Sequence, residues 1–384
     1  MATTTDYINQ LKTDKTNLVN NLIEKGVSAT QDETFTSLVP KVLDIETGIT
    51  PTGTINITEN GTYDVTDKSS ANVNVPSALE EYFNESYKSG SYPNYWLPNI
   101  LKKVPSFSME GITSMRNQFY GCVNITTIPA LDTSKVTNMQ NMFYMCENIE
   151  TIPQLDTSKV TDMSNMFYGC KKIVNIPPLD KASCTNINNM FNKCEKLTII
   201  PFADLNFDNI SNVSNMFSNC YSLTSVGNLS FANAPHIERL FSCSYQDMSN
   251  LETIGNVYCP KATSLYDAFQ NLSKLVSVGE ITCEAATNVR DMFSNDKALQ
   301  NIGGLINLGQ AYSTTESANY NYYKLDLSTK YNLTHDSLMN VGNNLYDIAS
   351  KGCNIQQVII GSTNIGKLTP EELLVFTNKG WSVS

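Results

Sequence analysis

The arrangement of apolar and polar positions recurs along the middle of the chain with a period of about 24 residues. Residues 131–146, LDTSKVTNMQNMFYMC, and residues 155–170, LDTSKVTDMSNMFYGC, differ at only three positions. A phenylalanine recurs at the same phase of each copy: Phe119, Phe143, Phe167, Phe191, Phe217, Phe241, Phe269 and Phe293. Self-similarity at a fixed period predicts a solenoid, in which each repeat is one coil and the stacked coils share a continuous core.

Each repeat divides into two halves with different hydrophobic patterns. The first half, such as ITTIPAL at 125–131, is rich in β-branched residues and predicts a short buried strand. The second half, such as VTNMQNMFYMC at 136–146, has apolar residues at offsets of 0, 3, 6, 7 and 10, which predicts one face of a short helix. A proline or glycine follows the central residue of each strand and is expected to turn the chain out of it: Pro129, Pro153, Pro177, Gly227, Gly255, Gly279 and Gly303.

These halves predict an α/β repeat, a leucine-rich-repeat-like solenoid of short parallel strands and short helices. Parallel strands lie about 4.8 Å apart, whereas packed helices need about 8–10 Å. A stack with strands on one side and helices on the other is therefore expected to curve, as a horseshoe or a shallow arc, with the strands on the inner side.

A cysteine follows the phenylalanine by three residues in the first five repeats: Cys122, Cys146, Cys170, Cys194 and Cys220. This phase predicts a ladder of buried free thiols, because cysteine behaves there as a small hydrophobe. Equivalent positions in neighbouring coils are expected to be too far apart for disulfides. The array contains no CxxC and the chain has only two histidines, so no metal site is expected.

The N-terminal segment predicts two helices, at 5–25 and 34–44, with a partial heptad seam in the first. They form either a local helical hairpin or an oligomerising base. The segment GTINITENGTYDVT at 53–66 predicts a β-hairpin with Glu59-Asn60-Gly61 as its loop, and ANVNVP at 71–76 adds a third strand.

The C-terminal region follows a tyrosine-rich insertion at 311–324. One helix is expected to begin after Thr334, and a second has a capping box with Thr369 as its N-cap and Glu372 at N3. The predicted organisation has five parts: an attachment or oligomerisation segment at 1–48, a small β module at 49–76, a connector and N-terminal cap at 77–107, the solenoid at 108–310, and the insertion with the C-terminal cap at 311–384.

Charge and composition narrow the function classes. The net charge is −11, with 26 Lys and Arg residues against 37 Asp and Glu residues, which argues against nucleic acid and anionic membranes as partners. No apolar run approaches the roughly 20 residues needed to span a bilayer. The N-terminus lacks the features of a signal peptide, so we expect the protein to be made and folded in the cytosol.

The sequence offers no catalytic constellation, and we expect neither an enzyme nor a cofactor. His236 and His335 are framed by no motif. Asp132, Asp156 and Asp180 recur once per repeat. They are compatible with a calcium ladder, but turn formation is the better interpretation, because calcium needs several converging oxygens.

Three surfaces are candidates for binding. The first is a stripe of tyrosines one residue after the phenylalanines, which either stacks on sugar rings or packs between helices: Tyr120, Tyr144 and Tyr168. The second is the outward face of the strands, which either bonds sugars or protein or is simply solvated: Thr127, Thr151, Gln154, Asn175, Asn228 and Asn256. The third is the insertion, whose tyrosines favour recognition: Tyr320, Tyr322 and Tyr323.

Two stretches resemble known families. The phrase LDTSKVTNMxxMFxxC, repeated over residues 104–310, resembles the BspA-like leucine-rich repeats of bacterial surface proteins, in the variant common in Gram-positive bacteria and their phages. Such repeats are associated with adhesion and with protein or glycan binding. The stretch from YINQLK through ANVNV resembles the N-terminal module of tail-associated and receptor-binding proteins of phages that infect Gram-positive bacteria.

The resemblances imply a phage tail-tip or tail-fibre protein. Residues 1–76 would attach to other tail or baseplate proteins, and the solenoid would bind a glycan or protein on the host surface. A homo-oligomer is expected, with a trimer favoured, located on the virion tail after assembly in the host cytoplasm. The alternatives are a bacterial cell-surface adhesin and a structural decoration protein of the virion without a receptor role. The ending NKGWSVS resembles that of phage-borne members, so the chain is expected to end there.

Overall fold

The computed structural model describes residues 54–57, 70–73, 104, 109–245, 248–312, 324–328, 330 and 332–384. The chain forms two compact units, residues 1–101 and residues 102–384. In the first unit, β1 (Thr54–Ile57) pairs in parallel with β2 (Ser70–Val73). The strand predicted at 71–76 therefore begins at Ser70 and lies beside β1. The helices predicted at 5–25 and 34–44, the second strand of the predicted hairpin, and the connector at 77–107 apart from Val104 lie outside the described residues.

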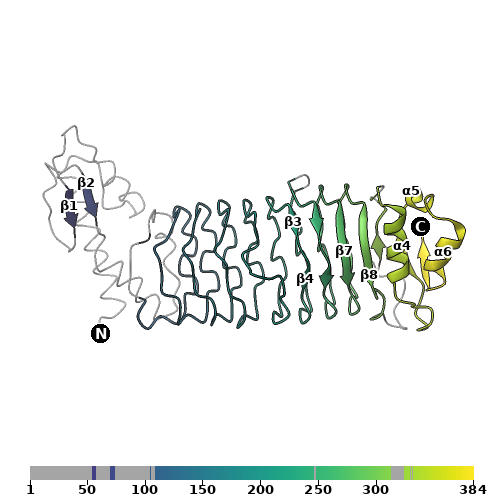
Figure 1. Ribbon diagram of the computed structural model, residues 1–384, viewed down its shortest axis with the longest axis horizontal. Coiled ribbons are helices and arrows are strands. Elements are labelled where there is room, and N and C mark those ends of the chain that lie inside the picture. The colour runs from purple at the N-terminus through teal and green to yellow at the C-terminus, as the bar shows by residue number, and fades with distance from the viewer. Residues whose placement is uncertain are drawn as a thin grey trace, which may run out of the picture. The chain divides into compact units, whose positions relative to one another are not determined.

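The second unit is a stack of coils, shown side by side in Figure 1. The prediction of a helix in the second half of each repeat was wrong, because residues 109–245 and 248–312 contain no helix. In residues 139–146, N–H groups alternate between two kinds of acceptor. Met142 bonds to the carbonyl of Met139 in its own coil, while Phe143 bonds to the carbonyl of Met166 in the next coil. Successive tight turns thus place apolar residues at near-helical spacing without forming a helix.

Left-handed residues cause this alternation. Asn141 has φ 56° and Met145 has φ 57°, and both values interrupt a right-handed helix. Asparagine adopts this conformation more readily than other non-glycine residues. An asparagine with positive φ stands two residues before the phenylalanine in five coils: Asn117, Asn141, Asn165, Asn189 and Asn215.

The predicted horseshoe curvature was also wrong. Both sides of each coil bond to the neighbouring coil through the backbone: Phe143 donates to Met166 on one side, and Glu150 donates to Thr126 on another. Backbone pairing of this kind sets a spacing of about 4.8 Å on both sides. No thicker helical layer wedges the coils apart, and the array in Figure 1 extends with little bend.

Regular strands appear only in the later coils: β3 (Ser225–Val226), β4 (Leu229–Ser230), β5 (Thr253–Ile254), β6 (Val257–Tyr258), β7 (Ser277–Thr282) and β8 (Asn301–Ile306). All of these strands pair in parallel. The first half of β7 pairs with β5, which pairs in turn with β3. The second half of β7 pairs with β6, which pairs in turn with β4, and β8 lies on the other side of β7.

The residue after the strand's central position explains this difference. Gly255 donates its N–H to the carbonyl of Val226, whereas Pro129, Pro153 and Pro177 have no N–H to donate. A glycine is also required by space, because a Cβ on Gly255 would lie 2.8 Å from the carbonyl carbon of Gly227. These glycines therefore continue the strand at β7 and β8, contrary to the expectation that they turn the chain out of it.

The core contains a column of stacked rings. The Phe143 ring lies between those of Phe119 and Phe167, with centroids 5.4 Å apart on each side. The stack continues to Phe293, and all eight phenylalanines of the repeat are at most 2 % exposed. The cysteines of the repeat lie beside this column, and their predicted burial is confirmed.

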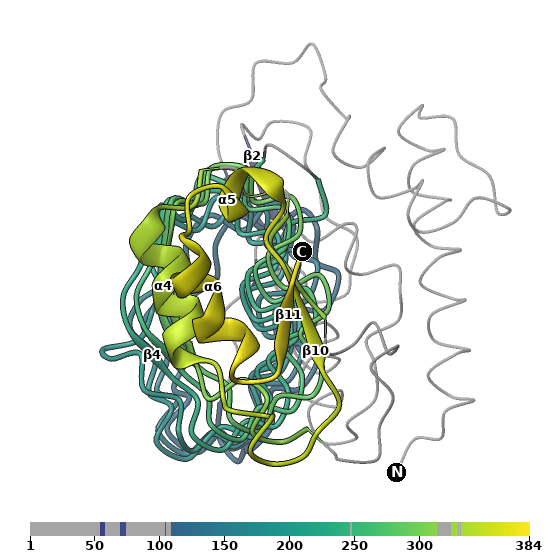
Figure 2. The ribbon, with the colours of Figure 1, turned by 90° about the vertical axis from the view of Figure 1, so that its right-hand side faces the viewer.

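The C-terminal cap covers the last coil. It contains β9 (Leu325–Asp326), α4 (His335–Asn344), β10 (Gln356–Ile359), α5 (Ser362–Ile365), α6 (Pro370–Thr377) and β11 (Trp381–Val383). The end view in Figure 2 shows α4 and α6 across one side of the coil outline and β10 and β11 on the other. The predicted N-cap of Thr334 and the capping box of Thr369 with Glu372 are both confirmed.

Candidate functional site

The predicted tyrosine stripe is a stacked ladder. The rings of Tyr120 and Tyr144 lie 4.6 Å apart at 6°, and those of Tyr144 and Tyr168 lie 4.7 Å apart at 8°. The ammonium of Lys193 lies 5.4 Å from the centroid of the Tyr168 ring. Burial, followed by the two neighbouring tyrosines, raises the pKa of Tyr144. Within the ladder the ring faces cover one another, so solvent meets ring edges and hydroxyl groups. Of the two sequence interpretations, the geometry matches part-buried packing.

The predicted polar face is exposed at all six candidate positions: Thr127, Thr151, Gln154, Asn175, Asn228 and Asn256. Four of these side chains also join coils, and one of them is Asn175, whose side-chain oxygen accepts from the hydroxyl of Thr198 at 3.3 Å. Gln154 donates to the carbonyl of Pro178 at 2.8 Å, and the side-chain oxygen of Asn228 accepts from the N–H of Asn256 at 2.9 Å. The side-chain oxygen of Asn256 accepts from Glu280 in the same way. These residues therefore stiffen the face that they line.

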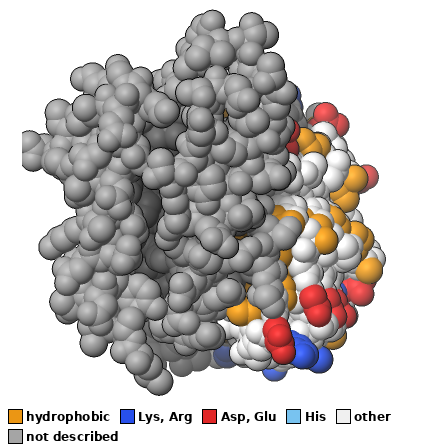
Figure 3. All heavy atoms as spheres, turned by 90° about the vertical axis from the view of Figure 1, so that its left-hand side faces the viewer, with side chains coloured by type: hydrophobic (Ala, Val, Ile, Leu, Met, Phe, Trp, Pro, Cys, Tyr) orange, Lys and Arg blue, Asp and Glu red, His pale blue; other side chains and the backbone are white. Residues whose placement is uncertain are grey.

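The face is interrupted by two exposed apolar side chains in adjacent coils. Ile199 is 65 % exposed and Val174 is 41 % exposed. Figure 3 shows the end of the molecule opposite the cap, where hydrophobic and uncharged side chains cover much of the coloured surface and charged side chains gather toward its margins.

The third candidate surface cannot be placed, because Tyr320, Tyr322 and Tyr323 lie outside the described residues. Tyr312, at the start of the insertion, is described. Its ring is 2 % exposed and lies 5.7 Å from that of Trp381 in β11. This tyrosine anchors the insertion to the cap.

The recurring aspartates form turns, as predicted. Asp132 accepts hydrogen bonds from the N–H and the hydroxyl of Ser134, and these bonds lower the pKa of its carboxyl group. The next residue, Thr133, is buried and bonds to the backbone of Asp156 in the following coil, and Thr157 bonds to Asp180 in the same way. A buried threonine ladder therefore joins these corners.

The ladder ends at Lys181, which occupies the next threonine position. Its ammonium forms an ion pair with Asp204 at 2.6 Å and lies 5.4 Å from the ring centroid of Phe207. The pairing between the two coils also shifts here. Lys181 bonds to a residue 23 positions later, whereas Thr185 accepts from a residue 26 positions later. In a regular corner the corresponding offsets are 23, from Thr133 to Asp156, and 24, from Thr137 to Thr161. The following coil therefore carries two extra residues at this corner.

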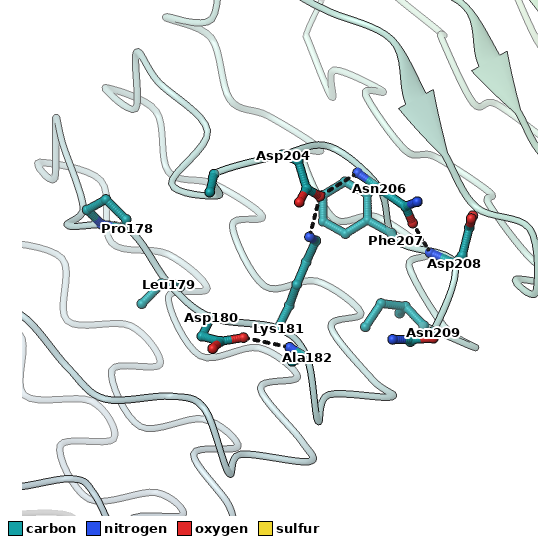
Figure 4. A pocket seen from close by; sticks show the side chains of 12 residues that line it. Pro178, Leu179, Asp180, Lys181, Ala182, Asp204, Asn206, Phe207, Asp208 and Asn209 are labelled. Atoms are coloured by element: carbon teal, nitrogen blue, oxygen red, sulfur yellow. Dashed lines mark hydrogen bonds and ion pairs between the residues drawn. The ribbon is translucent and has the colours of Figure 1, made fainter.

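A cavity of about 680 Å³ lies at this corner. It is lined by Pro178, Leu179, Asp180, Lys181, Ala182, Ala203, Asp204, Asn206, Phe207, Asp208, Asn209 and Ile210. Figure 4 shows Lys181 reaching from one coil to Asp204 on the next, with Asn209 at the opposite margin from Pro178. We call this site the corner pocket. The bond from Lys181 is the main cause that lowers the pKa of Asp204.

Sequence reasoning missed the corner pocket. The signal was present as the spacing of 26 residues between Phe191 and Phe217, and as the change from LDTSK at 155–159 to LDKAS at 179–183. The structure shows that they coincide at one corner of two adjacent coils.

The two histidines form ordinary surface ion pairs. His236 lies 3.1 Å from Glu238, and the Nε2 atom of His335 lies 2.8 Å from Glu372. In the described part of the chain, no group of three or more His, Cys, Asp or Glu side chains is arranged to hold a metal ion. None of the helices described here is long and apolar enough to cross a bilayer.

Comparisons with known proteins concern the repeats. Residues 94–175 and 146–254 match a family described as Mycoplasma protein of unknown function, DUF285. No curated protein matches the sequence. Among solved structures, a leucine-rich cell surface protein from Faecalibacterium prausnitzii matches with 16 % identity, covering 66 % of this chain and 87 % of that one. Its TM-score is 0.21, which is too low to support an argument about this chain. Residues 94–254 are therefore similar to repeats of the BspA-like kind, over less than half of the 384 residues.

Proposed function

We propose that this chain is a non-enzymatic binding protein whose repeat array recognises a glycan or protein on a bacterial surface. The observation that carries the proposal is the outward strand face. Its polar side chains are exposed in successive coils, and several of them are fixed by hydrogen bonds to the next coil. A surface held in this way loses little conformational entropy when a partner binds.

The backbone of the array supports the same function. Each coil bonds to its neighbours on more than one side, and the core rings stack without a break from Phe119 to Phe293. A solenoid of this kind presents an extended surface, because each coil contributes the same few outward positions. Such a surface suits a repetitive partner, such as a cell-wall polymer or the exposed part of a surface protein.

The finer proposal is a tail-tip or tail-fibre protein of a phage that infects Gram-positive bacteria. In this proposal residues 1–76 attach the chain to other tail or baseplate proteins, and the protein is a trimer on the virion. This part rests on the sequence resemblance of the N-terminal segment, which lies largely outside the described residues.

A bacterial cell-surface adhesin is the second candidate. It is favoured by the family match, because the matching family is described from Mycoplasma, a cellular organism. The two candidates share the binding face and differ in the particle that carries it.

Immunogold electron microscopy separates the two. Antibodies raised against residues 102–384, the second compact unit, would be applied to phage particles and to uninfected cells of the source culture. We expect gold at the distal tail. Gold on uninfected cells and none on particles would replace the tail protein with the adhesin. Gold on the capsid would leave a virion protein and remove the receptor role.

A cell-binding assay tests the shared part of the proposal. Purified full-length protein would be incubated with bacterial cells of the source habitat and measured by fluorescence. Saturable binding is expected. A fivefold variant with Thr127, Thr151, Asn175, Thr253 and Ser277 changed to lysine should bind differently, since these five side chains lie on the exposed or half-exposed strand face. Absence of binding to every strain tested would reject the recognition function.

A further inference from the structure

The corner pocket is a local exception in a regular array. The threonine that closes the two preceding corners is replaced by Lys181, and two extra residues precede the equivalent position in the next coil. Together these changes leave a cavity of about 680 Å³. Small-molecule pockets in proteins have volumes of about 300–1,000 Å³. The cavity therefore has the size of a ligand site.

Charge limits what this cavity accepts. Three carboxylates line it, those of Asp180, Asp204 and Asp208, and Lys181 is the only cationic side chain among the lining residues. The Lys181 ammonium is already neutralised by Asp204 at 2.6 Å. The remaining charge is negative and repels phosphate, sulfate and carboxylate ligands. An uncharged or amine-bearing ligand meets no such repulsion.

The hydrogen-bonding groups of the corner pocket restrict the class of ligand further. One oxygen of Asp180 accepts from the N–H of Ala182 at 2.7 Å, and one oxygen of Asp208 accepts from the hydroxyl of Ser230 at 2.6 Å. Among the described residues, the second oxygen of Asp180 and the side-chain amide of Asn209 have no hydrogen-bond partner. A carboxylate oxygen only accepts, whereas an amide both donates and accepts. Hydroxyl groups on adjacent carbons satisfy both, because each hydroxyl donates and accepts.

The cavity also has apolar walls. The exposed side chains of Pro178, Ala182 and Ala203 line it, and the Lys181 stem reaches toward Asp204 in Figure 4. A cavity with an apolar wall beside hydrogen-bond acceptors and an amide fits a ligand that has C–H groups on one face and hydroxyl groups along its edge. The same two coils carry the exposed side chains of Val174 and Ile199 on the strand face. A ligand longer than one ring has further apolar surface to contact there.

We propose that the corner pocket binds one sugar ring of an uncharged or amine-bearing saccharide. Vicinal hydroxyl groups bond to Asp180 and Asn209, and the C–H face of the ring lies toward Pro178 and Ala203. This inference rests on the proposed function, because it names the ligand class through which the array recognises a cell surface.

A blocking variant tests it. Ala203 is exposed and lines the cavity, and its methyl group makes no hydrogen bond, so Ala203→Trp fills the space without removing a polar contact. Ala349→Trp is the matched control, since Ala349 is an exposed alanine in the C-terminal cap and does not line the cavity. Full-length proteins would be applied to a printed array of neutral, amine-bearing and acidic oligosaccharides. Wild type and Ala349→Trp should bind neutral or amine-bearing members, and Ala203→Trp should bind them at least about tenfold more weakly.

A second variant excludes misfolding as the cause of weaker binding. Asn209→Ala removes one amide from the margin of the pocket and should weaken binding by about three- to tenfold. Its thermal unfolding should match that of wild type, because this amide makes no hydrogen bond with the described residues.

The outcomes are distinguishable. Neutral saccharide binding that survives Ala203→Trp and Asn209→Ala would overturn the pocket while keeping glycan recognition by the array. Preference for acidic saccharides would overturn the ligand class. Cell binding without binding to any printed saccharide would overturn this inference and keep the proposed function. Absence of cell binding as well would reject the proposed function itself.

Discussion

The thiol of Cys170 donates a hydrogen bond to the carbonyl oxygen of Phe143, 27 residues earlier, at 3.2 Å. Cys146, Cys194 and Cys220 make the same bond to the phenylalanine of the preceding coil. In these four coils the cysteine therefore donates a hydrogen bond to a backbone carbonyl inside the core, in addition to filling apolar space. In the last coil the same position is Asp296, which accepts from the N–H of Leu272 at 2.7 Å.

The thiol ladder should be chemically inert in the folded protein. Burial raises the pKa of Cys122 to about 12 and that of Cys170 well above its usual range, and the thiolate is the reactive form. Nine of the ten cysteines are buried, and Cys353 is half-buried. Iodoacetamide at about pH 8 should therefore label at most Cys353 in the native protein, and all ten cysteines in guanidinium.

Mass spectrometry of the labelled peptides checks this prediction. The Cys353→Ser variant should take up almost no label when folded. Rapid native labelling of Cys146 or Cys170 would contradict the buried ladder.

The phenylalanine stack should dominate stability. Phe167 is fully buried and stacks on Phe143 and Phe191, with centroids 5.4 and 5.8 Å away. Phe167→Ala should lower the free energy of unfolding by about 3–5 kcal/mol, because it removes buried apolar area and leaves a cavity. Tyr168→Ala, in the half-exposed ladder beside it, should cost clearly less. Urea unfolding followed by circular dichroism would measure both, and equal losses would contradict a core centred on the phenylalanines.

Asp296 should tie the last coil to the cap. Its side chain is fully buried, and so is that of Lys330. Burial raises the pKa of the Asp296 carboxyl group well above its ordinary value, and the charge of Lys330 is the main effect in the opposite direction. Asp296→Ala leaves the N–H of Leu272 without its acceptor and removes one of the two carboxyl groups, those of Asp296 and Asp326, whose charges act on Lys330. Leaving this buried N–H without an acceptor should cost about 1–3 kcal/mol.

The loss of stability in Asp296→Ala should be confined to the C-terminal end of the array. Hydrogen exchange should show faster exchange in β8 and α4 than in the coils around Phe143. The control is Glu252→Ala, an exposed glutamate with no hydrogen bond from its side chain among the described residues. Uniform exchange along the array in Asp296→Ala would argue against a local role.

The pair of His335 and Glu372 should make the cap slightly sensitive to pH. The hydrogen bond to Glu372 is the main cause that raises the pKa of His335 above its ordinary value of 6.5. A group with a raised pKa in the folded state contributes stability below its unfolded pKa and loses that contribution as the pH rises through the folded pKa. Wild type should therefore lose more stability than His335→Gln between about pH 5.5 and 8.5.

An NMR titration checks the cause directly. The His335 imidazole should titrate above 6.5 in wild type and closer to it in Glu372→Gln. A His335 pKa at or below its ordinary value would contradict the pairing. Because both side chains are largely exposed, the effect on stability should be small and weakened by salt.

The sequence by itself determined the period, the buried phases and the ends of the cap helices. Phe143 and Cys146 could be assigned to the core because one phase of a stacked repeat faces inward in every coil. Thr334 and Thr369 could be assigned as N-caps because capping depends on residues three or fewer positions away. These features are local, or repeat often enough to be read as a pattern.

Only the tertiary structure decided between helix and turns, and between an arc and a straight array. Residues 136–146 have helical spacing, yet Asn141 and Met145 adopt positive φ, and the N–H groups around them bond to the next coil. The asparagine two residues before the phenylalanine in five of the eight coils carried this information, but its meaning depends on a neighbour about 24 residues away. The corner pocket depends on a shift of pairing between two coils at Lys181, and such a shift exists only once the coils are stacked.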